Sequence, residues 1–140
     1  MADAKTVVKR LFEEPWTGSF DAIDELVAPE YVGYDAAEPE PIKGPAGVKA
    51  NVEKYMGGFS DARITVVEQI AEGDIVATRW TGRGTHDGEL AGIAPTGKEV
   101  TVKGLTFSRL ENDKVVEEHQ VWDALGMLVQ LGAVPAPTTA

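Results

Sequence analysis

Apolar residues near the start of the chain recur at the spacing of an amphipathic helix. Between residues 4 and 14, one face holds Val7, Val8, Leu11 and Phe12, with lysine and glutamate on the other face. Residues three and four apart lie on the same side of a helix, so this spacing predicts a first helix. The proline that follows residue 14 ends it.

Two further helices are indicated by their capping and stop signals. The second is predicted to begin at Ser19 or Asp21, whose side chains suit a helix cap, and to stop at Pro29. The third is predicted from Pro45 to Met56, because proline suits a first turn and the two glycines that follow suit a helix end. Between these helices we expect a short extended piece at residues 31–34 and a proline-rich acidic loop at residues 35–43.

The second half of the chain has the pattern of strands. Four stretches rich in valine, isoleucine and threonine are separated by turn signals, and a short helix and a frayed tail follow them. Helices followed by hairpin-linked strands predict an α+β fold, in which a cone-shaped, curved antiparallel sheet packs against three N-terminal helices and leaves a pocket between them. The predicted strands are residues 62–70, 74–84, 99–110 and 114–122, the short C-terminal helix is 124–131, and the tail is 133–140.

Composition and charge narrow the possible partners. The chain has 140 residues, 43% of them hydrophobic, which suits one soluble domain over residues 1–140. Its formal net charge of −10, with only 13 lysines and arginines, argues against a nucleic acid or an anionic membrane as partner. It has no cysteine, which excludes disulfides and thiolate chemistry. We see neither a signal peptide nor an apolar stretch of roughly 18 residues, and therefore expect a cytoplasmic protein.

The end of the last predicted strand carries the candidate chemistry. His119 and Asp123 are four residues apart on an extended segment, so both side chains project to the same face as Val115 and Val121. We expect this to be the apolar face that packs against the helices. Burial there would raise the pKa of the Asp123 carboxyl toward the range in which a general acid or base works at neutral pH.

Each of these residues also has a purely structural interpretation. Asp123 precedes a predicted helix and could cap it. His119 could be a structural histidine bonded to Asp123 or to a backbone carbonyl, and His86, where a strand meets a glycine-rich loop, could fix that loop. Nothing in the spacing of the two histidines and Asp123 demands a metal, so no metal site is predicted.

An amide and several aromatic residues are candidates for the wall of the pocket. Asn51 shares an apolar helix stripe with Val48 and Val52, and a buried amide must bond either to local backbone or to a substrate. On a regular strand Trp122 points away from Asp123, which favours a subunit interface for this tryptophan. For the aromatic residues the alternative is ordinary core packing. The predicted substrate-binding residues are Trp16, Tyr34, Asn51, Tyr55, Phe59, Trp80 and Phe107.

The order of predicted elements and two motifs resemble those of the SnoaL-like polyketide cyclases, also called ester cyclases. The first motif is Gly84-Thr85-His86-Asp87-Gly88 with the later run Pro95-Thr96-Gly97-Lys98, and the second runs from Asp123 to Gly132. With the element order, the resemblance covers residues 4–132. It implies the cone-shaped fold of nuclear transport factor 2 and ketosteroid isomerase, and a homodimer or homotetramer formed through the outer sheet face.

The resemblance also implies an activity. Characterised family members close a ring by intramolecular aldol condensation without a metal or organic cofactor, which implies a cofactor-free enzyme for a small hydrophobic carbonyl substrate. Asp123 falls on the family's acid/base aspartate and His86 on a family histidine near the pocket. Asp123 would then be the base, His119 its orienting or electrophilic partner, and His86 a second hydrogen-bond donor. His119 stands where the family often has tryptophan, and Tyr34 where it often has histidine, so the family's substrate is not carried over.

Other functions fit the same fold. Double-bond isomerisation or epoxide hydrolysis would use the same pocket, although the second needs further carboxylates around a water. A protein that only binds a small hydrophobic ligand, or a dimeric scaffold, is the alternative from another class. Fold alone does not separate these functions.

Overall fold

The computed structural model describes residues 3–135, and its elements follow the predicted α+β order. The helices are α1 (Ala4–Glu13), α2 (Asp21–Leu26), α3 (Gly44–Gly58) and α4 (Ala124–Gln130), with a 3₁₀ turn, η1 (Glu14–Thr17), directly after α1. The strands are β1 (Val27–Asp35), β2 (Ile42–Lys43), β3 (Arg63–Glu72), β4 (Ile75–Thr85), β5 (Glu99–Glu111) and β6 (Lys114–Trp122). The predicted tail at 133–140 lies mostly outside the described residues.

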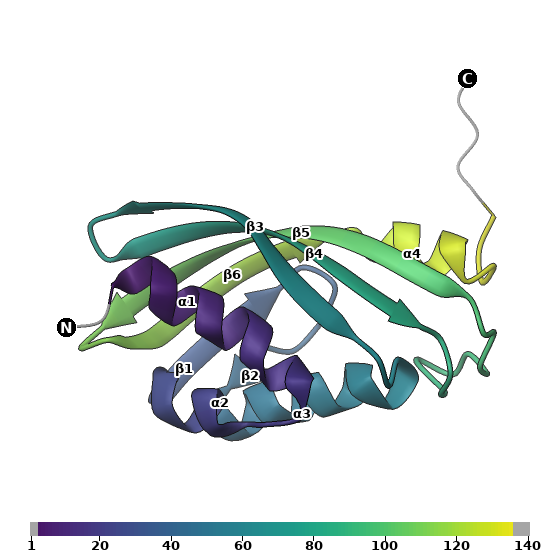
Figure 1. Cartoon of the computed structure of the whole chain (residues 1–140), viewed down its shortest axis with the longest axis horizontal. Coiled ribbons are helices and arrows are strands. Elements are labelled where there is room, and N and C mark those ends of the chain that lie inside the picture. Colours follow the sequence, from purple (N-terminus) through teal and green to yellow (C-terminus); the bar gives the residue numbers. More distant parts are fainter. Residues whose placement is uncertain (1–2, 136–140) are drawn as a thin grey trace.

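The strands form one curved sheet in the order β2-β1-β6-β5-β4-β3, and α1, α2 and α3 cover one of its faces (Figure 1). Neighbouring strands pair antiparallel except β1 and β6, so the predicted antiparallel sheet contains one parallel pairing. β1 begins at Val27, inside the predicted second helix, and is longer than the extended piece expected at 31–34. Its pairing with β6, a contact far away in sequence, overrides the local helical pattern.

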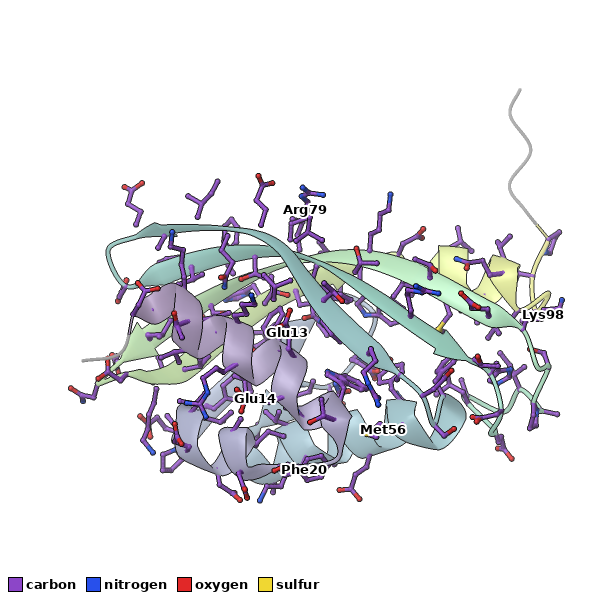
Figure 2. All side chains as sticks on the ribbon, in the orientation of Figure 1. Glu13, Glu14, Phe20, Met56, Arg79 and Lys98 are labelled. Carbon is purple, nitrogen blue, oxygen red and sulfur yellow. The ribbon has the colours of Figure 1, made fainter. Side chains whose placement is uncertain are left out.

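The main core fills the space between the helices and the covered face of the sheet. Val7, Val8 and Leu11 of α1 pack there with residues of α2 and with Val76 and Val115 of the sheet. Burying one such side chain stabilises the fold by roughly 1.5–3 kcal/mol, so the apolar stripe predicted for the first helix is what holds α1 in place. The side chain of Glu13 adds a polar anchor, because it accepts a hydrogen bond of 2.8 Å from the backbone of Val66 on β3 (Figure 2).

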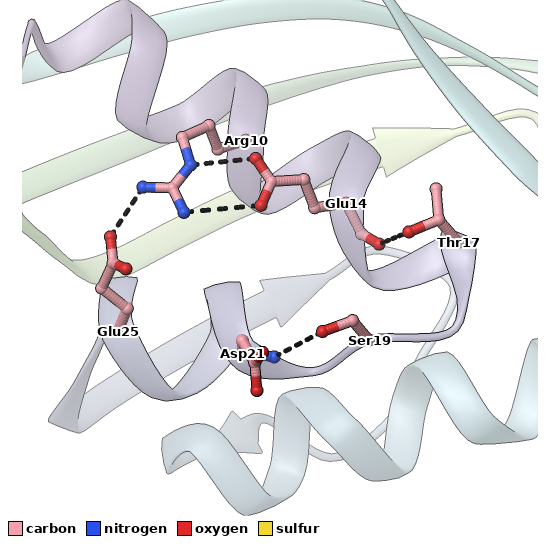
Figure 3. A network of polar contacts seen from close by, with 6 residues as sticks. All are labelled: Arg10, Glu14, Thr17, Ser19, Asp21 and Glu25. Carbon is pink, nitrogen blue, oxygen red and sulfur yellow. Dashed lines mark hydrogen bonds and ion pairs between the residues drawn. The ribbon is translucent and has the colours of Figure 1, made fainter.

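A polar network joins α1 to α2 and so places η1 between them (Figure 3). The Arg10 guanidinium bonds Glu14 at 2.9 Å and Glu25 at 2.6 Å, and this contact lowers the pKa of the Glu25 carboxyl. Exposed ion pairs of this kind contribute little to stability, so the network orients the two helices more than it stabilises them. The predicted cap at Ser19 or Asp21 is wrong, because Phe20 is the N-cap of α2 and no side chain caps the helix. Ser19 Oγ only accepts a hydrogen bond from the backbone N–H of Asp21, the first residue of α2.

The other face of the sheet is free of helices α1–α3 and carries charged and apolar side chains. Arg79 points away from the helices on this face (Figure 2) and pairs with Glu68. We call this the outer face and the helix-covered side the inner face. Within residues 3–135, no helix combines the length and the apolar character that crossing a membrane requires.

Candidate functional site

A cavity lies between the inner face of the sheet and helix α3. It has two lobes that share six residues: Trp16, Asp35, Asn51, Ile64, Trp80 and Gln120. The lobe that also includes Tyr55, Phe59 and Trp122 is called the outer lobe and has a volume of about 630 Å³. The lobe that also includes Tyr31 and Glu118 is called the inner lobe and has a volume of about 720 Å³. Both volumes include the open mouth, and both lobes lie on the inner face of the sheet. The mainly apolar lining with a few polar groups is of the kind that binds a small organic ligand.

Aromatic side chains supply much of the wall. Trp16, Tyr55, Phe59 and Trp80 line the outer lobe, and Trp16 and Trp80 also line the inner one. The structure therefore places these four predicted residues at the cavity; their binding of a substrate stays a prediction. Gly104 sits opposite Trp80 in the sheet, and any side chain there would overlap the indole ring.

A chain of hydrogen bonds crosses the floor of the cavity and ends on a carboxylate. Trp80 Nε1 donates to Thr106 Oγ1 at 3.0 Å, and that hydroxyl donates to Gln120 Oε1 at 2.8 Å. Gln120 Nε2 then donates to Asp35 Oδ2 at 2.9 Å. Trp122 Nε1 also donates to Asp35, with 3.2 Å to each oxygen. Indole and amide donors thus hold the Asp35 carboxylate in one orientation.

Asp35 is the carboxylate that lies in both lobes. It ends strand β1, is partly buried, and also accepts a hydrogen bond of 2.8 Å from the backbone of Ala37. Among the described residues, the Asp35 side chain is the acceptor in every hydrogen bond that it makes. Sequence reasoning placed this residue at the start of an irregular loop and missed it as a site residue.

A second acidic side chain, Glu118, lines the inner lobe. Tyr31 donates to Glu118 Oε1 at 2.7 Å and Ser108 donates to Glu118 Oε2 at 2.5 Å. Burial raises the pKa of the Glu118 carboxyl, and the two hydroxyl groups offset only part of that rise. The acid with a raised pKa that the sequence predicted near the end of β6 is therefore present, but it is Glu118.

Asn51 lies in both lobes, as the helical spacing predicted. Among the hydrogen bonds of residues 3–135, none involves its side-chain amide. The expected bond to local backbone is thus absent from the described structure, and the amide is available to a ligand. Nearby, Tyr55 bonds Glu38 at 3.2 Å, and burial together with this acid raises the pKa of the Tyr55 hydroxyl.

The prediction that Asp123 is buried is wrong. Asp123 is exposed, does not line either lobe, and caps α4 by accepting a 2.8 Å hydrogen bond from the backbone of Gly126. A side chain at position 126 would overlap the Asp123 carboxylate. The D-x-x-G part of the second motif is thus explained by helix capping, the structural alternative for this residue. A catalytic role for Asp123 stays a prediction without support from the cavity.

A β-bulge in β6 explains the error. Arg109 pairs with Glu117 and Leu110 with Val115, so Val116 is an extra residue on β6. Val115 and Val116 are both buried, and strict alternation restarts only after them. The residues of β6 that line the cavity are consequently Glu118, Gln120 and Trp122, whereas His119, Val121 and Asp123 are exposed.

The bulge places His119 on the outer face, where it lies beside Tyr34 of β1 and Phe107 of β5. His119 is exposed, stacks on the Tyr34 ring at 5.0 Å and bonds Glu117 at 2.7 Å. Phe107 is opposite His119 in the sheet and 58% exposed, so its predicted place in the pocket is wrong. Tyr34 also lines the inner lobe, although the residue is 47% exposed. Trp122, expected at an interface, instead lines the cavity.

His86 is fully buried behind the cavity wall. Its Nδ1 accepts from the backbone N–H of Thr96 at 3.1 Å and lies 3.0 Å from the Thr96 hydroxyl. Its ring packs against Phe59 at 5.4 Å between centroids, and its Nε2 has no hydrogen-bond partner among the described residues. These contacts match the loop-fixing interpretation, and His86 does not line either lobe.

Sequence reasoning missed Asp35, Glu118 and Gln120 as site residues. Two patterns in the sequence indicate that these residues face the cavity. The doublet Val115-Val116, followed by alternating residues, is the pattern of a bulge. Glycines within strands, such as Gly33 and Gly104, indicate where a large aromatic side chain lies across the neighbouring backbone. As for metals, residues 3–135 contain no group of three or more histidine, cysteine, aspartate or glutamate side chains that could hold an ion.

Comparisons with known proteins agree with this architecture. The family model for SnoaL-like polyketide cyclases matches residues 6–131. The aklanonic acid methyl ester cyclase AcmA of Streptomyces galilaeus is 30% identical over 99% of this chain and 96% of its own.

Solved structures give the same result. IdmH of Streptomyces antibioticus, assigned as a polyketide cyclase, is 30% identical with a TM-score of 0.82 over 94% of this chain and 99% of its own. A protein from Jannaschia sp. CCS1, assigned as a SnoaL-like polyketide cyclase, is 26% identical with a TM-score of 0.84 over 94% of this chain and 93% of its own.

Proposed function

The chain belongs to the SnoaL-like polyketide cyclase family, and on this premise we propose that it closes a ring in an apolar carbonyl substrate by an intramolecular aldol reaction. The observation that carries the proposal is the Asp35 carboxylate, held by Gln120 and Trp122 inside an aromatic-walled cavity. An aldol closure needs a base beside an acidic C–H bond and a donor beside the carbonyl oxygen.

Asp35 is the proposed base. Its carboxylate takes the proton from the carbon next to a substrate carbonyl, and the electron pair of that C–H bond moves into the carbonyl to form an enolate. The Asn51 amide, which is free to donate, stabilises the enolate oxygen. The enolate carbon then attacks a second carbonyl of the same molecule, forming the ring C–C bond and an alkoxide. The alkoxide then takes up one proton, which balances the proton that Asp35 removed from carbon, so the closure involves no net gain or loss of protons.

The substrate class follows from the lining. The walls of the outer lobe are mainly apolar and aromatic, which favours a flat, hydrophobic molecule. Arg63 is also on this lobe, bonded to the backbone carbonyls of Trp16 and Ala62 at 2.7 Å each. It supplies a donor at the mouth for an oxygen-rich end of the substrate. A polyketide methyl ester, the kind of compound named for AcmA, has both features.

The test compares two aspartates in the same assay. Aklanonic acid methyl ester is offered to the wild-type protein, to Asp35→Asn and to Asp123→Asn, and ring closure is followed by absorbance and mass spectrometry. We expect Asp35→Asn to lower kcat about 10²–10⁴-fold, the usual contribution of a general base. Asp123→Asn should stay close to wild type, because asparagine caps a helix comparably. Circular dichroism spectra of both variants show whether the fold is kept.

Each other outcome has a definite meaning. If Asp123→Asn loses turnover and Asp35→Asn keeps it, the base is Asp123, as the family resemblance implied, and the assignment to Asp35 is wrong. If the wild type binds the ester without converting it or related esters, the protein is a ligand-binding member of the fold and the cyclase proposal is overturned.

A further inference from the structure

The inner lobe holds an acidic side chain, Glu118, that has no role in the proposed ring closure by Asp35. Glu118 bonds only to the hydroxyl groups of Tyr31 and Ser108, and no lysine, arginine or histidine forms an ion pair with it among the described residues. Glu118 is partly buried. A carboxylate that is shielded from water and has no cation beside it is costly to ionise, so such a group tends to keep its proton. The site therefore contains two acids in contrasting settings: Asp35 among indole and amide donors, and Glu118 between two hydroxyls.

The local packing is built around this contact. Tyr31 and Glu118 come from adjacent parallel strands, with Gly33 directly opposite Glu118 in the register. A side chain at position 33 would overlap the Tyr31 hydroxyl, so glycine is what allows the phenol to lie across β1 and reach the acid. Ser108, opposite Glu118 on β5, is fully buried. Three strands thus converge on one carboxyl group that borders the ligand space.

The surroundings of Glu118 are poor in charge. The residues that α1 and α3 contribute to the inner lobe are apolar, apart from the neutral Asn51. From β1, the titratable neighbours are Tyr31 and Asp35. Burial, together with the nearby Glu118 and Asp35, raises the pKa of the Tyr31 hydroxyl well above its usual value. Tyr31 therefore stays a neutral donor throughout the physiological range. Asp35 is the other carboxylic acid among the residues that line the inner lobe.

We propose that Glu118 is the proton donor of this site, the partner of the base Asp35. This inference rests on the proposed ring closure. Asp35 gains the proton that leaves carbon, and Glu118 gives its carboxyl proton to the alkoxide oxygen formed by the C–C bond. The product leaves as a neutral alcohol, with Asp35 protonated and Glu118 ionised. Return of one proton from Asp35 to Glu118, through the water that refills the cavity, restores both groups without a net change.

The alternative is that Glu118 only braces β1, β6 and β5 together. The two roles differ in their effect on the pH profile. A proton donor gives kcat an alkaline limb, because activity falls as the donor ionises. The hydroxyls of Tyr31 and Ser108 lower the pKa of Glu118, so removing either one raises it. Tyr31→Phe and Ser108→Ala should therefore move the alkaline limb to higher pH, which a mere brace would not do.

The experiment records kcat against pH for the wild type, Glu118→Gln, Tyr31→Phe and Ser108→Ala with aklanonic acid methyl ester. We expect Glu118→Gln to lose about 10²-fold or more in kcat and to lack the alkaline limb. Ser108→Ala, the smaller change, should keep most of the turnover with its limb shifted upward. Wild-type turnover in Glu118→Gln, or a limb that stays in place in both hydroxyl variants, overturns the donor role while leaving ring closure by Asp35 intact.

A spectroscopic readout is independent of turnover. The infrared difference between the wild type and Glu118→Gln should show the C=O stretch of a neutral carboxylic acid, and this band should disappear at the pH of the alkaline limb. A band absent at neutral and mildly acidic pH means that Glu118 is ionised and overturns the proposal. Failure of the wild type to convert any ester instead overturns ring closure itself, so the two failures are distinguishable.

Discussion

At the scale of single residues, glycines decide which polar groups reach the cavity. Gly104 leaves space for the Trp80 indole, which donates to Thr106 one step further along β5. Gly33 does the same for Tyr31, which donates to Glu118. The Trp80 ring lies across a glycine of the neighbouring strand and the Tyr31 ring across a glycine of its own strand, and each ring ends in a hydrogen bond. This arrangement lets a mostly apolar cavity hold several bonded polar groups without leaving them unsatisfied.

The raised pKa of Glu118 predicts how stability depends on pH. Burial holds this pKa above 4.5 in the folded protein, whereas in the unfolded chain it is close to the ordinary value. Its contribution to stability is therefore complete below about pH 4.3 and is lost as pH rises through the folded-state pKa. Glu118→Gln removes this titration. We expect the free energy of unfolding of the wild type to fall relative to the variant as pH rises from 4 to 8.

Urea unfolding at several pH values measures this difference. Each unit of separation between the folded and unfolded pKa corresponds to about 1.4 kcal/mol. Glu53→Gln is a suitable control, since it removes one exposed carboxyl from α3 without touching the cavity. Parallel stability curves for the wild type and Glu118→Gln would show that Glu118 titrates normally, contrary to this account.

At the scale of elements, the sequence predicts the features that follow from apolar periodicity and misses those that depend on the register of strand pairing. The helices and the four long strands follow from apolar spacing and turn residues, and so does the aromatic wall formed by Trp16, Tyr55, Phe59 and Trp80. The positions of the polar site residues do not follow from this spacing. The Val116 bulge moves every later side chain of β6 to the opposite face of the sheet. One extra residue thus exchanges Asp123 and His119 for Glu118 and Gln120 as cavity groups.

Helix α4 provides a prediction at this scale. Its seven residues are held by the Asp123 cap and by Met127, which packs in a second apolar cluster with Phe59 and Leu131. Asp123→Ala should cost about 0.5–2 kcal/mol of stability, because the first turn loses its side-chain acceptor. Asp123→Asn should cost much less. Chemical denaturation of both variants measures the cost; equal losses in the two would mean that the carboxylate charge, not the cap, is what matters.

At the scale of the whole molecule, the two faces of the sheet differ in the residues that they carry. The inner face carries the core and the cavity, while the outer face exposes Leu105, Phe107 and Val121, which are 51%, 58% and 55% exposed. Leu105 is opposite Val121 in the sheet, and Phe107 is opposite His119, which stacks on Tyr34. These side chains therefore form one continuous apolar and aromatic area, of the kind that marks an interaction site. The homodimer or homotetramer implied by the resemblance would bury this area.

This assembly predicts the effect of one charge at the centre of the outer face. Leu105→Glu places a carboxylate where a second sheet would pack, and an unpaired buried charge opposes association strongly. We expect sedimentation equilibrium to show a dimer or tetramer for the wild type and a monomer for this variant. Leu125→Glu is the matched control, because Leu125 is similarly exposed, at 52%, but lies on α4 and not on the sheet. A wild type that stays monomeric at high concentration would contradict the prediction. A Leu105→Glu protein that still assembles would place the interface elsewhere. Whether or not this variant assembles, its cavity should bind ligand as in the wild type, because the cavity lies on the opposite face of the sheet.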